Sequence, residues 1–230
     1  MVQHRPHTTV VLAMSADGKI ADFKRSPARF GSDVDITHLQ QQIATADAVL
    51  LGASTLRAYG TTLTISQPML LQHRQQEGKT NQPIHIVTTQ SGNLNPEIKF
   101  FQQAITRWLL TTTVGAQSWQ GRSEFDQILV FETPTGKIDL IAALKYLDSL
   151  HITRLAVLGG GTLVASMLES DLIDELWLTV CPLILGGVTA PTPVDGQGFM
   201  SHLAPRLQLL EVKTINQEVF LHYRLQRPID

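Results

Sequence analysis

The sequence predicts an α/β fold in which a largely parallel central sheet is flanked by helices and ends in a C-terminal antiparallel hairpin. Three observations predict it. Short apolar runs alternate with segments of helical character along most of the chain. Several of these runs are continuously apolar, which is typical of strands buried on both faces. Finally, Leu207–Ile215 and Glu218–Leu225 are strand-like stretches separated only by Asn216 and Gln217, which is the spacing of a hairpin.

The other expected strands are short apolar runs, most of them followed by glycine or polar residues. In chain order they are Thr8–Met14, Asp47–Leu51, Ile84–Thr88, Trp108–Thr112, Ile128–Phe131, Leu155–Leu158 and Leu176–Leu185. The helices expected between them are Asp33–Thr45, Pro96–Gln103, Ile138–Leu150 and Thr162–Leu168. Asp33 is the expected cap of its helix. The polar, Gln-rich segment Thr61–Gln82 is expected to be a surface excursion with room for one helix.

Length and composition describe an ordinary globular chain. Its 230 residues carry a formal net charge of -2, so we expect one domain over residues 1–230 that binds neither nucleic acid nor membrane. No apolar run reaches the roughly 18 residues that a membrane span needs. The start of the chain lacks a signal-peptide pattern, and Cys181 is the only cysteine, so a cytoplasmic location is expected. The histidines show no metal-ligand spacing, and no metal site is expected.

The sharpest local signal is the run Gly159–Gly160–Gly161–Thr162 between an expected strand and an expected helix. Glycines let the backbone approach a ligand closely, and the free N–H groups of a helix start attract anions. This favours a phosphate or dinucleotide site over a plain strand–helix turn. The usual dinucleotide fingerprint and the P-loop lysine are both absent, which disfavours an ordinary Rossmann enzyme and a P-loop NTPase.

Two earlier segments have a related layout. Gly52–Ala53–Ser54–Thr55 also follows a strand and precedes an expected helix, and it is either a plain helix cap or a second ligand-facing turn. Asp17, in Ser15–Ala16–Asp17–Gly18, either forms an Asx-type turn or takes part in proton chemistry. Among the arginines of loops and helix ends, one or two are candidates to clamp a phosphate: Arg25, Arg29, Arg57 and Arg74.

Taken together, four motifs resemble the reductase domain of riboflavin biosynthesis, the RibD C-terminal type, which shares the dihydrofolate reductase fold. They are AMSADGKIA at 13–21, DAVLLGAST at 47–55, GGGTL at 159–163 and DELWLTVCPLILGG at 174–187. The resemblance implies a homodimeric reductase without the deaminase domain of bifunctional relatives. It also implies NADPH as cofactor. The implied substrate is a phosphoribosylamino-pyrimidine, 5-amino-6-(5-phosphoribosylamino)uracil or its diamino analogue, whose ribosyl group is reduced to ribityl.

Site residues follow from the same resemblance, position by position. The implied cofactor contacts are Ala13, Gly52, Ser54, Thr55, Thr89, Ser91, Gly159, Gly160, Gly161, Thr162 and Leu163. The expected substrate contacts are Ser26, Arg29, Leu63 and Leu158, of which Arg29 replaces family arginines that this chain lacks, and Asp17, near the implied position of the nicotinamide, is the expected catalytic residue. In this reading the hydride goes to C1′ of the ring-opened imine, and the proton comes from a nearby acid or from water.

The sequence departs from the family pattern mainly on the substrate side. Leu158 stands where the family often has Glu, and Tyr59–Gly60–Thr61 replaces an Asp-Asp-Pro segment. Ser66 and Ile43 stand where arginines are expected. Arg29, Arg57 and Arg74 are therefore alternative candidates for the substrate phosphate. Two further hypotheses stay open: a reductase of the same fold for another pterin-like, pyrimidine or small carbonyl substrate, and a non-catalytic nucleotide-binding protein.

Overall fold

The chain divides into two compact units, each built from separate stretches of sequence. The structure is a computed structural model that describes residues 4–227. The described part of the first unit is residues 4–7 and 40–156, and that of the second is residues 8–39 and 157–227. The single domain expected over residues 1–230 stays a prediction.

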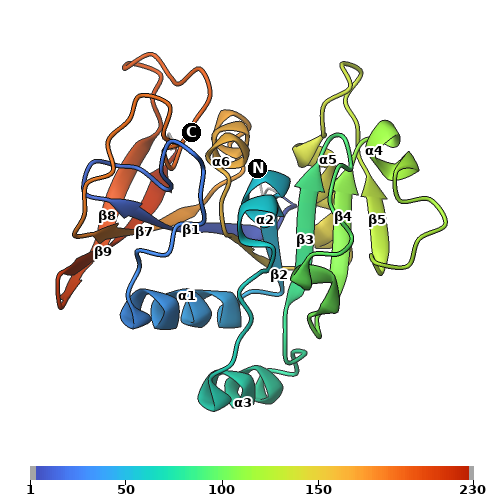
Figure 1. The fold of residues 1–230 in the computed structure, drawn as a ribbon, viewed down its shortest axis with the longest axis horizontal. Helices are drawn as coiled ribbons and strands as arrows, with labels where there is room; N and C mark the ends of the chain where they lie inside the picture. The colour runs from blue at the N-terminus through green and yellow to red at the C-terminus, as the bar shows by residue number, and fades with distance from the viewer. Residues whose placement is uncertain (1–3, 228–230) are drawn as a thin grey trace. The chain divides into compact units, whose positions relative to one another are not determined.

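The first unit holds a parallel sheet. β2 (Ala48–Gly52), β3 (Ile84–Thr89), β4 (Arg107–Thr111) and β5 (Gln127–Val130) pair in parallel in that order, and β6 (Arg154–Val157) lies beside β2. Figure 1 shows β3, β4 and β5 side by side. β2 is apolar throughout, and all five of its residues are buried, as is typical of a strand covered on both faces. The helices of this unit are α2 (Ala53–Tyr59), α3 (Pro68–Gln76), the 3₁₀ turn η1 (Lys99–Gln102), α4 (Thr113–Gln117) and α5 (Leu140–Ser149).

The second unit combines parallel and antiparallel pairing. β1 (His7–Ser15) runs parallel to β7 (Glu175–Cys181), β7 runs antiparallel to β9 (Glu218–Gln226), and β9 pairs with β8 (Arg206–Ile215) in a hairpin. Asn216 closes the hairpin with φ of 56°. The predicted fold class, a largely parallel sheet with a C-terminal antiparallel hairpin, is therefore confirmed.

The first part of α1 (Asp33–Thr45), up to Leu39, packs against the sheet of the second unit. Val34 and Leu39 of this helix pack on a buried cluster formed by Val11, Trp177 and Phe220. The helix begins at Asp33, but the cap is Ser32, whose hydroxyl accepts hydrogen bonds from the N–H groups of Val34 and Asp35 at 3.1 and 3.3 Å. The expectation that Asp33 is the cap is therefore wrong by one residue.

Two other element boundaries differ from expectation. The helix expected over 96–103 is only η1, because Asn95 and Pro96 form a turn in which the Asn95 side chain accepts from the N–H of Glu97 at 2.9 Å. The strand expected to run to Leu185 ends at Cys181. Pro182 follows, and proline has no N–H to continue the ladder.

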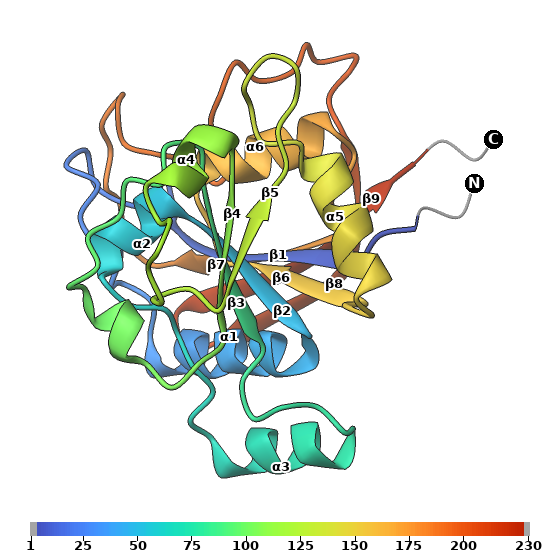
Figure 2. The same cartoon turned by 90° about the vertical axis from the view of Figure 1, so that its right-hand side faces the viewer.

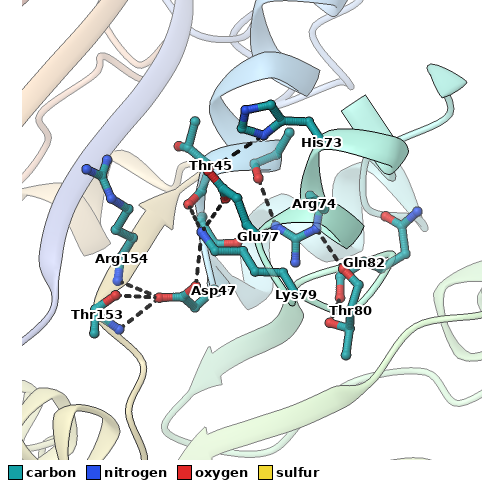
Figure 3. A network of polar contacts seen from close by, with 12 residues as sticks. Thr45, Asp47, His73, Arg74, Glu77, Lys79, Thr80, Gln82, Thr153 and Arg154 are labelled. Carbon is teal, nitrogen blue, oxygen red and sulfur yellow. Dashed lines mark hydrogen bonds and ion pairs between the residues drawn. The ribbon is translucent and has the colours of Figure 1, made fainter. Parts of the chain in front are cut away.

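α3 lies below the start of β3, as Figure 2 shows, and its anchor is the side chain of Arg74. Arg74 is 1% exposed, and its guanidinium donates to the carbonyl oxygens of Thr80, Ala44 and Ala46 at 2.8, 2.9 and 2.6 Å. Figure 3 shows it in a network where Lys79 also pairs with Asp47 at 3.3 Å. Arg74 is thus engaged at the C-terminal end of α1 and is not available to clamp a phosphate, which corrects that expectation.

His85 gives the first unit a predicted sensitivity to acid. The ring is fully buried on β3, its Nδ1 lies 3.1 Å from the Thr62 hydroxyl, and burial lowers its pKa to about 4 from 6.5. The folded state therefore favours the neutral ring, and stability is lost as pH falls from about 6.5 toward 4. We expect urea unfolding at pH 5 to show a loss of about 2 kcal/mol from this group alone.

The matched comparison is His85→Gln against His73→Gln. His73 is exposed on α3 and serves as the surface control, and we expect His85→Gln to flatten the pH dependence more than His73→Gln does. The pKa of His38 is also lowered to about 4 by burial, so part of the dependence remains in both variants. An unchanged pH dependence in His85→Gln contradicts the assignment.

Candidate active site

The glycine run forms a left-handed turn that begins α6 (Gly161–Glu169). Gly159 and Gly160 have φ of 116° and 97°, a region that residues with a side chain rarely adopt. The N–H groups of Gly161, Thr162 and Leu163, in the first turn of α6, donate to no acceptor within residues 4–227. An open helix start behind a glycine turn attracts an anion through these N–H groups and the helix dipole.

The loop before β8 packs closely on this turn. The N–H of Asp195 donates to the carbonyl of Gly161 at 3.1 Å, and the Asp195 carboxylate accepts from the N–H of Thr192 at 3.0 Å. A β-carbon at Gly161 would overlap the carbonyl oxygen of Thr192. Gly161 is therefore required by packing, while Gly159 and Gly160 are required by their backbone conformation.

Asp17 ties the end of β1 to the segment after β7. Its carboxylate accepts from the Ser15 hydroxyl at 2.6 Å and from the N–H groups of Leu185 and Gly186 at 3.0 and 2.7 Å. These bonds, that of Ser15 first, lower the pKa of Asp17 to about 2. The group is ionised at neutral pH, so the geometry favours a turn-stabilising role over that of a proton donor. A catalytic role for Asp17 stays a prediction.

A second carboxylic acid near the end of β1 was missed from sequence. Burial raises the pKa of Asp35 on α1, the nearby Glu218 raises it further, and a hydrogen bond from Thr179 opposes both. Thr179 is the register partner of Ala13 on β1. A β-carbon at Gly31 would overlap the Asp35 carboxylate, so this glycine makes room for it. No local signal marks Asp35, because an acidic residue in the first turn of a helix is ordinarily a surface residue.

Glu218 and Cys181 complete this acidic cluster. Glu218 is 4% exposed, and its carboxylate accepts from the N–H and hydroxyl of Ser32 at 2.9 and 2.5 Å. Cys181 is fully buried, and its pKa is raised to about 12 by desolvation and by the two carboxylates, which agrees with a core role. Within residues 4–227, no three His, Cys, Asp or Glu side chains form a group suited to a metal ion.

In the first unit, the predicted cofactor residues lie at the ends of two neighbouring strands. Gly52 is the register partner of Thr88 and is the N-cap of α2, whose first turn contains Ser54 and Thr55. Thr89 ends β3, and Ser91 lies in the turn after it. The carboxyl ends of parallel strands at one edge of a sheet are where α/β proteins bind ligands. Ala13 and Gly159–Leu163 belong to the second unit.

Most of the positions that the family resemblance places near the substrate are apolar or already hydrogen-bonded within the protein. Leu158 packs against the Val11–Trp177–Phe220 cluster, and Ile43 is fully buried. The Ser66 hydroxyl and N–H both donate to the side chain of Gln40, at 3.1 and 2.8 Å. Leu63 is half-buried.

The loop after β1 is different, because it presents charged side chains to solvent. Arg29 is exposed there, and the N–H of Ser26 donates to the Asp22 carboxylate at 3.0 Å. Among the positions implied for the substrate, Arg29 is therefore the one that offers a positive charge.

The chain is similar to known proteins over nearly its whole length. The family model described as the RibD C-terminal domain matches residues 6–221. The 2,5-diamino-6-ribosylamino-4(3H)-pyrimidinone 5′-phosphate reductase of Archaeoglobus fulgidus is 28% identical over 197 residues, 85% of this chain and 89% of that protein. The solved structure of a pyrimidine reductase-like protein from Corynebacterium diphtheriae matches with a TM-score of 0.82 at 20% identity, covering 96% of this chain and 92% of the other.

A more distant solved structure extends the likeness of the fold. Dihydrofolate reductase from Enterococcus faecalis matches with a TM-score of 0.53 at 12% identity, and the match covers 98% of each chain. The fold is therefore dihydrofolate reductase-like, as expected. Among residues 4–227 there is no helix with the length and apolar character to cross a membrane.

Proposed function

This chain belongs to the RibD C-terminal domain family, and from that premise we propose that it is an NADPH-dependent reductase of riboflavin biosynthesis. The proposed reaction reduces the ribosyl group of a phosphoribosylamino-pyrimidine to ribityl. The observation that carries the proposal is the open N-terminus of α6 behind Gly159 and Gly160, in a chain similar to a named pyrimidinone phosphate reductase.

The residues of the α6 turn fit an anionic cofactor. Three N–H groups of its first turn have no acceptor within residues 4–227, and the two residues before it, Gly159 and Gly160, have a positive φ that favours glycine and carry no side chain. We assign the cofactor's pyrophosphate to Gly159–Leu163, with further contacts from Ala13, Gly52, Ser54, Thr55, Thr89 and Ser91. When bound, NADPH supplies the hydride.

The acid–base side of the site offers two carboxyl groups with opposite properties. Asp17 is held ionised by three donors, so it orients the end of β1. Asp35 has a raised pKa and is hydrogen-bonded by Thr179 of β7, which is the register partner of Ala13 on β1. Of the two, Asp35 is better suited to hold a proton for the reaction, while Asp17 positions the turn.

The substrate side motivates one alternative. The family's charged contacts to the substrate are missing at three positions, which here are the buried Ile43, the apolar Leu158 and the hydrogen-bonded Ser66. Such contacts could together supply several kcal/mol of substrate binding. Because Arg74 is buried, we assign the substrate phosphate to Arg29, with Ser26, Leu63 and Leu158 lining the substrate. If Arg29 does not supply this contact, a different pterin-like, pyrimidine or carbonyl substrate is favoured.

The test is an NADPH oxidation assay on the purified chain with 5-amino-6-(5-phosphoribosylamino)uracil and its diamino analogue. We expect oxidation that depends on both the enzyme and one of these substrates. Oxidation with another pyrimidine or pterin-like compound alone would support the alternative substrate. Cofactor binding without turnover across the whole panel would instead indicate a non-catalytic nucleotide-binding protein.

We also propose that the chain is a homodimer in the cytoplasm. One face of the β8–β9 hairpin is apolar and partly open: Leu207, Leu209 and Val212 of β8 are 41, 50 and 52% exposed, and Leu221 and Tyr223 of β9 are half-buried. A second copy of the same face would cover it through an isologous contact. That the chain binds no nucleic acid stays a prediction.

A further inference from the structure

The turn after β3 is held from behind by the segment Thr111–Trp119. Four consecutive carbonyl oxygens, those of residues 89–92, each accept a hydrogen bond from a side chain of this segment. Three of these bonds are short: Thr111 to Thr89 at 2.6 Å, Thr112 to Gln90 at 2.7 Å and the indole N–H of Trp119 to Gly92 at 2.7 Å. The fourth, from Ser118 to Ser91, is longer at 3.4 Å. All three side chains that make the short bonds are buried.

These hydrogen bonds also determine which way the N–H groups of the turn point. In a planar trans peptide the C=O and the following N–H point to opposite sides. Carbonyls drawn toward Thr111–Trp119 therefore turn the N–H groups of Gln90 and Ser91 away from it. Neither of these two N–H groups donates to an acceptor in the described part of the chain. Successive free N–H groups in a turn form a concave site for an anion.

Two glycines allow the segments to approach closely. Gly92 has φ of 64°, and a β-carbon on it would overlap the carbonyl of Gly115 in α4. A β-carbon on Gly115 would in turn overlap the Thr111 hydroxyl. The backbone of the turn at Gly92 therefore lies directly against the backbone of α4 at Gly115. This close contact leaves the peptides of the turn little freedom to rotate.

A positive charge lies next to the same turn. Arg57, in the last turn of α2, is exposed and donates to the carbonyl of Asn93 at 3.0 Å. Because Arg57 is exposed, its other guanidinium donors are accessible beside a turn that has free N–H groups. A guanidinium beside backbone N–H groups is a combination that recognises phosphate.

We propose that Thr111, Thr112 and Trp119 are positioning residues that set the affinity and phosphate preference of the cofactor. They hold the turn 89–92 so that its N–H edge, with Arg57 beside it, receives the phosphate on the adenosine end of NADPH. This inference rests on the proposed function. In it, Thr111, Thr112 and Trp119 act without contacting cofactor or substrate. Their buried hydrogen bonds to the turn determine how much more tightly NADPH binds than NADH.

The test uses Trp119→Phe, which removes the indole N–H and keeps an aromatic ring. Trp119 packs on Phe125 with ring centroids 4.8 Å apart, so Phe125→Leu is the matched control: it weakens the same cluster and leaves the bond to Gly92 intact. We expect Trp119→Phe to raise the Kd for NADPH roughly tenfold by calorimetry and to change the Kd for NADH little. The kcat at saturating NADPH stays within about twofold, as expected for a binding-only defect.

The outcomes separate this inference from the proposed function. If the unaltered chain binds no NADPH, the proposed function itself fails. If it binds NADPH and Trp119→Phe binds it equally well, or if Phe125→Leu weakens binding as much, the positioning role is overturned. Should Trp119→Phe not fold, Thr111→Val serves instead, because it removes the donor to Thr89 at nearly constant side-chain volume. The same loss of preference for NADPH over NADH is expected there, and its absence is equally decisive.

Discussion

Replacing Gly160 with valine is expected to abolish NADPH binding, with a loss of roughly 100-fold or more in affinity, about 2.7 kcal/mol. Gly160 is the N-cap of α6 and has φ of 97° and ψ of 101°. A β-branched residue does not adopt this conformation without strain, so the turn would rotate and its N–H groups would no longer converge. In our proposal the valine side chain would also fill the space of the cofactor phosphate. Calorimetric titration of the purified variant with NADPH measures the effect.

Gly78→Val is the control for backbone strain. Gly78 follows α3 and has φ of 73°, and no heavy atom of residues 4–227 lies within 4 Å of the position of a β-carbon on it. Its replacement is expected to cost about 1–2 kcal/mol of stability through strain alone and to leave NADPH binding unchanged. Retained NADPH affinity in Gly160→Val, with the fold intact by circular dichroism, would contradict the assignment of the cofactor's pyrophosphate to the α6 turn.

Replacing Arg74 with methionine is expected to lower the free energy of unfolding by about 3–5 kcal/mol. The variant leaves the buried carbonyl oxygens of Ala44 and Ala46, and the partly buried one of Thr80, without their charged donor. Arg74→Lys is expected to recover only part of the loss, because an ammonium group lacks the planar fork that reaches all three oxygens. Urea unfolding at neutral pH gives both values.

The control for Arg74 is Arg154→Met. Arg154 is exposed and contributes to the network of Figure 3 through its backbone N–H, which donates to Asp47 at 2.9 Å and remains in the variant. Its replacement should change stability by less than about 0.5 kcal/mol. A similar loss in both variants would mean that the buried bonds of Arg74 are not what holds α3 in place.

The elements that sequence reasoning placed correctly are those whose signal is local. Continuous apolar runs such as the one in β2 are typical of strands buried on both faces, and three consecutive glycines such as Gly159–Gly161 predict a turn. The hairpin at Asn216 is local in the same sense. No single turn identifies a fold family. Four motifs in the same order as in the family predicted it over nearly the whole chain.

The parts that were missed depend on residues far apart in sequence. Arg74 lies in a polar, Gln-rich stretch that predicts a surface position. It is buried because its acceptors on Ala44 and Ala46, 30 and 28 residues earlier in the chain, lie next to it in the fold. The turn at Asp17 was foreseen as one alternative, whereas its donors at Leu185 and Gly186 lie 168 and 169 residues away. Asp35 and Glu218 are neighbours only because α1 packs against β9.

The central claim is that the α6 turn makes this chain an NADPH-binding reductase, and calorimetric titration of the unaltered chain with NADPH and NADH tests it most directly. We predict saturable binding of NADPH well below millimolar concentration, and weaker binding of NADH. No measurable binding of NADPH at millimolar concentration, by a chain shown to be folded, would contradict the claim.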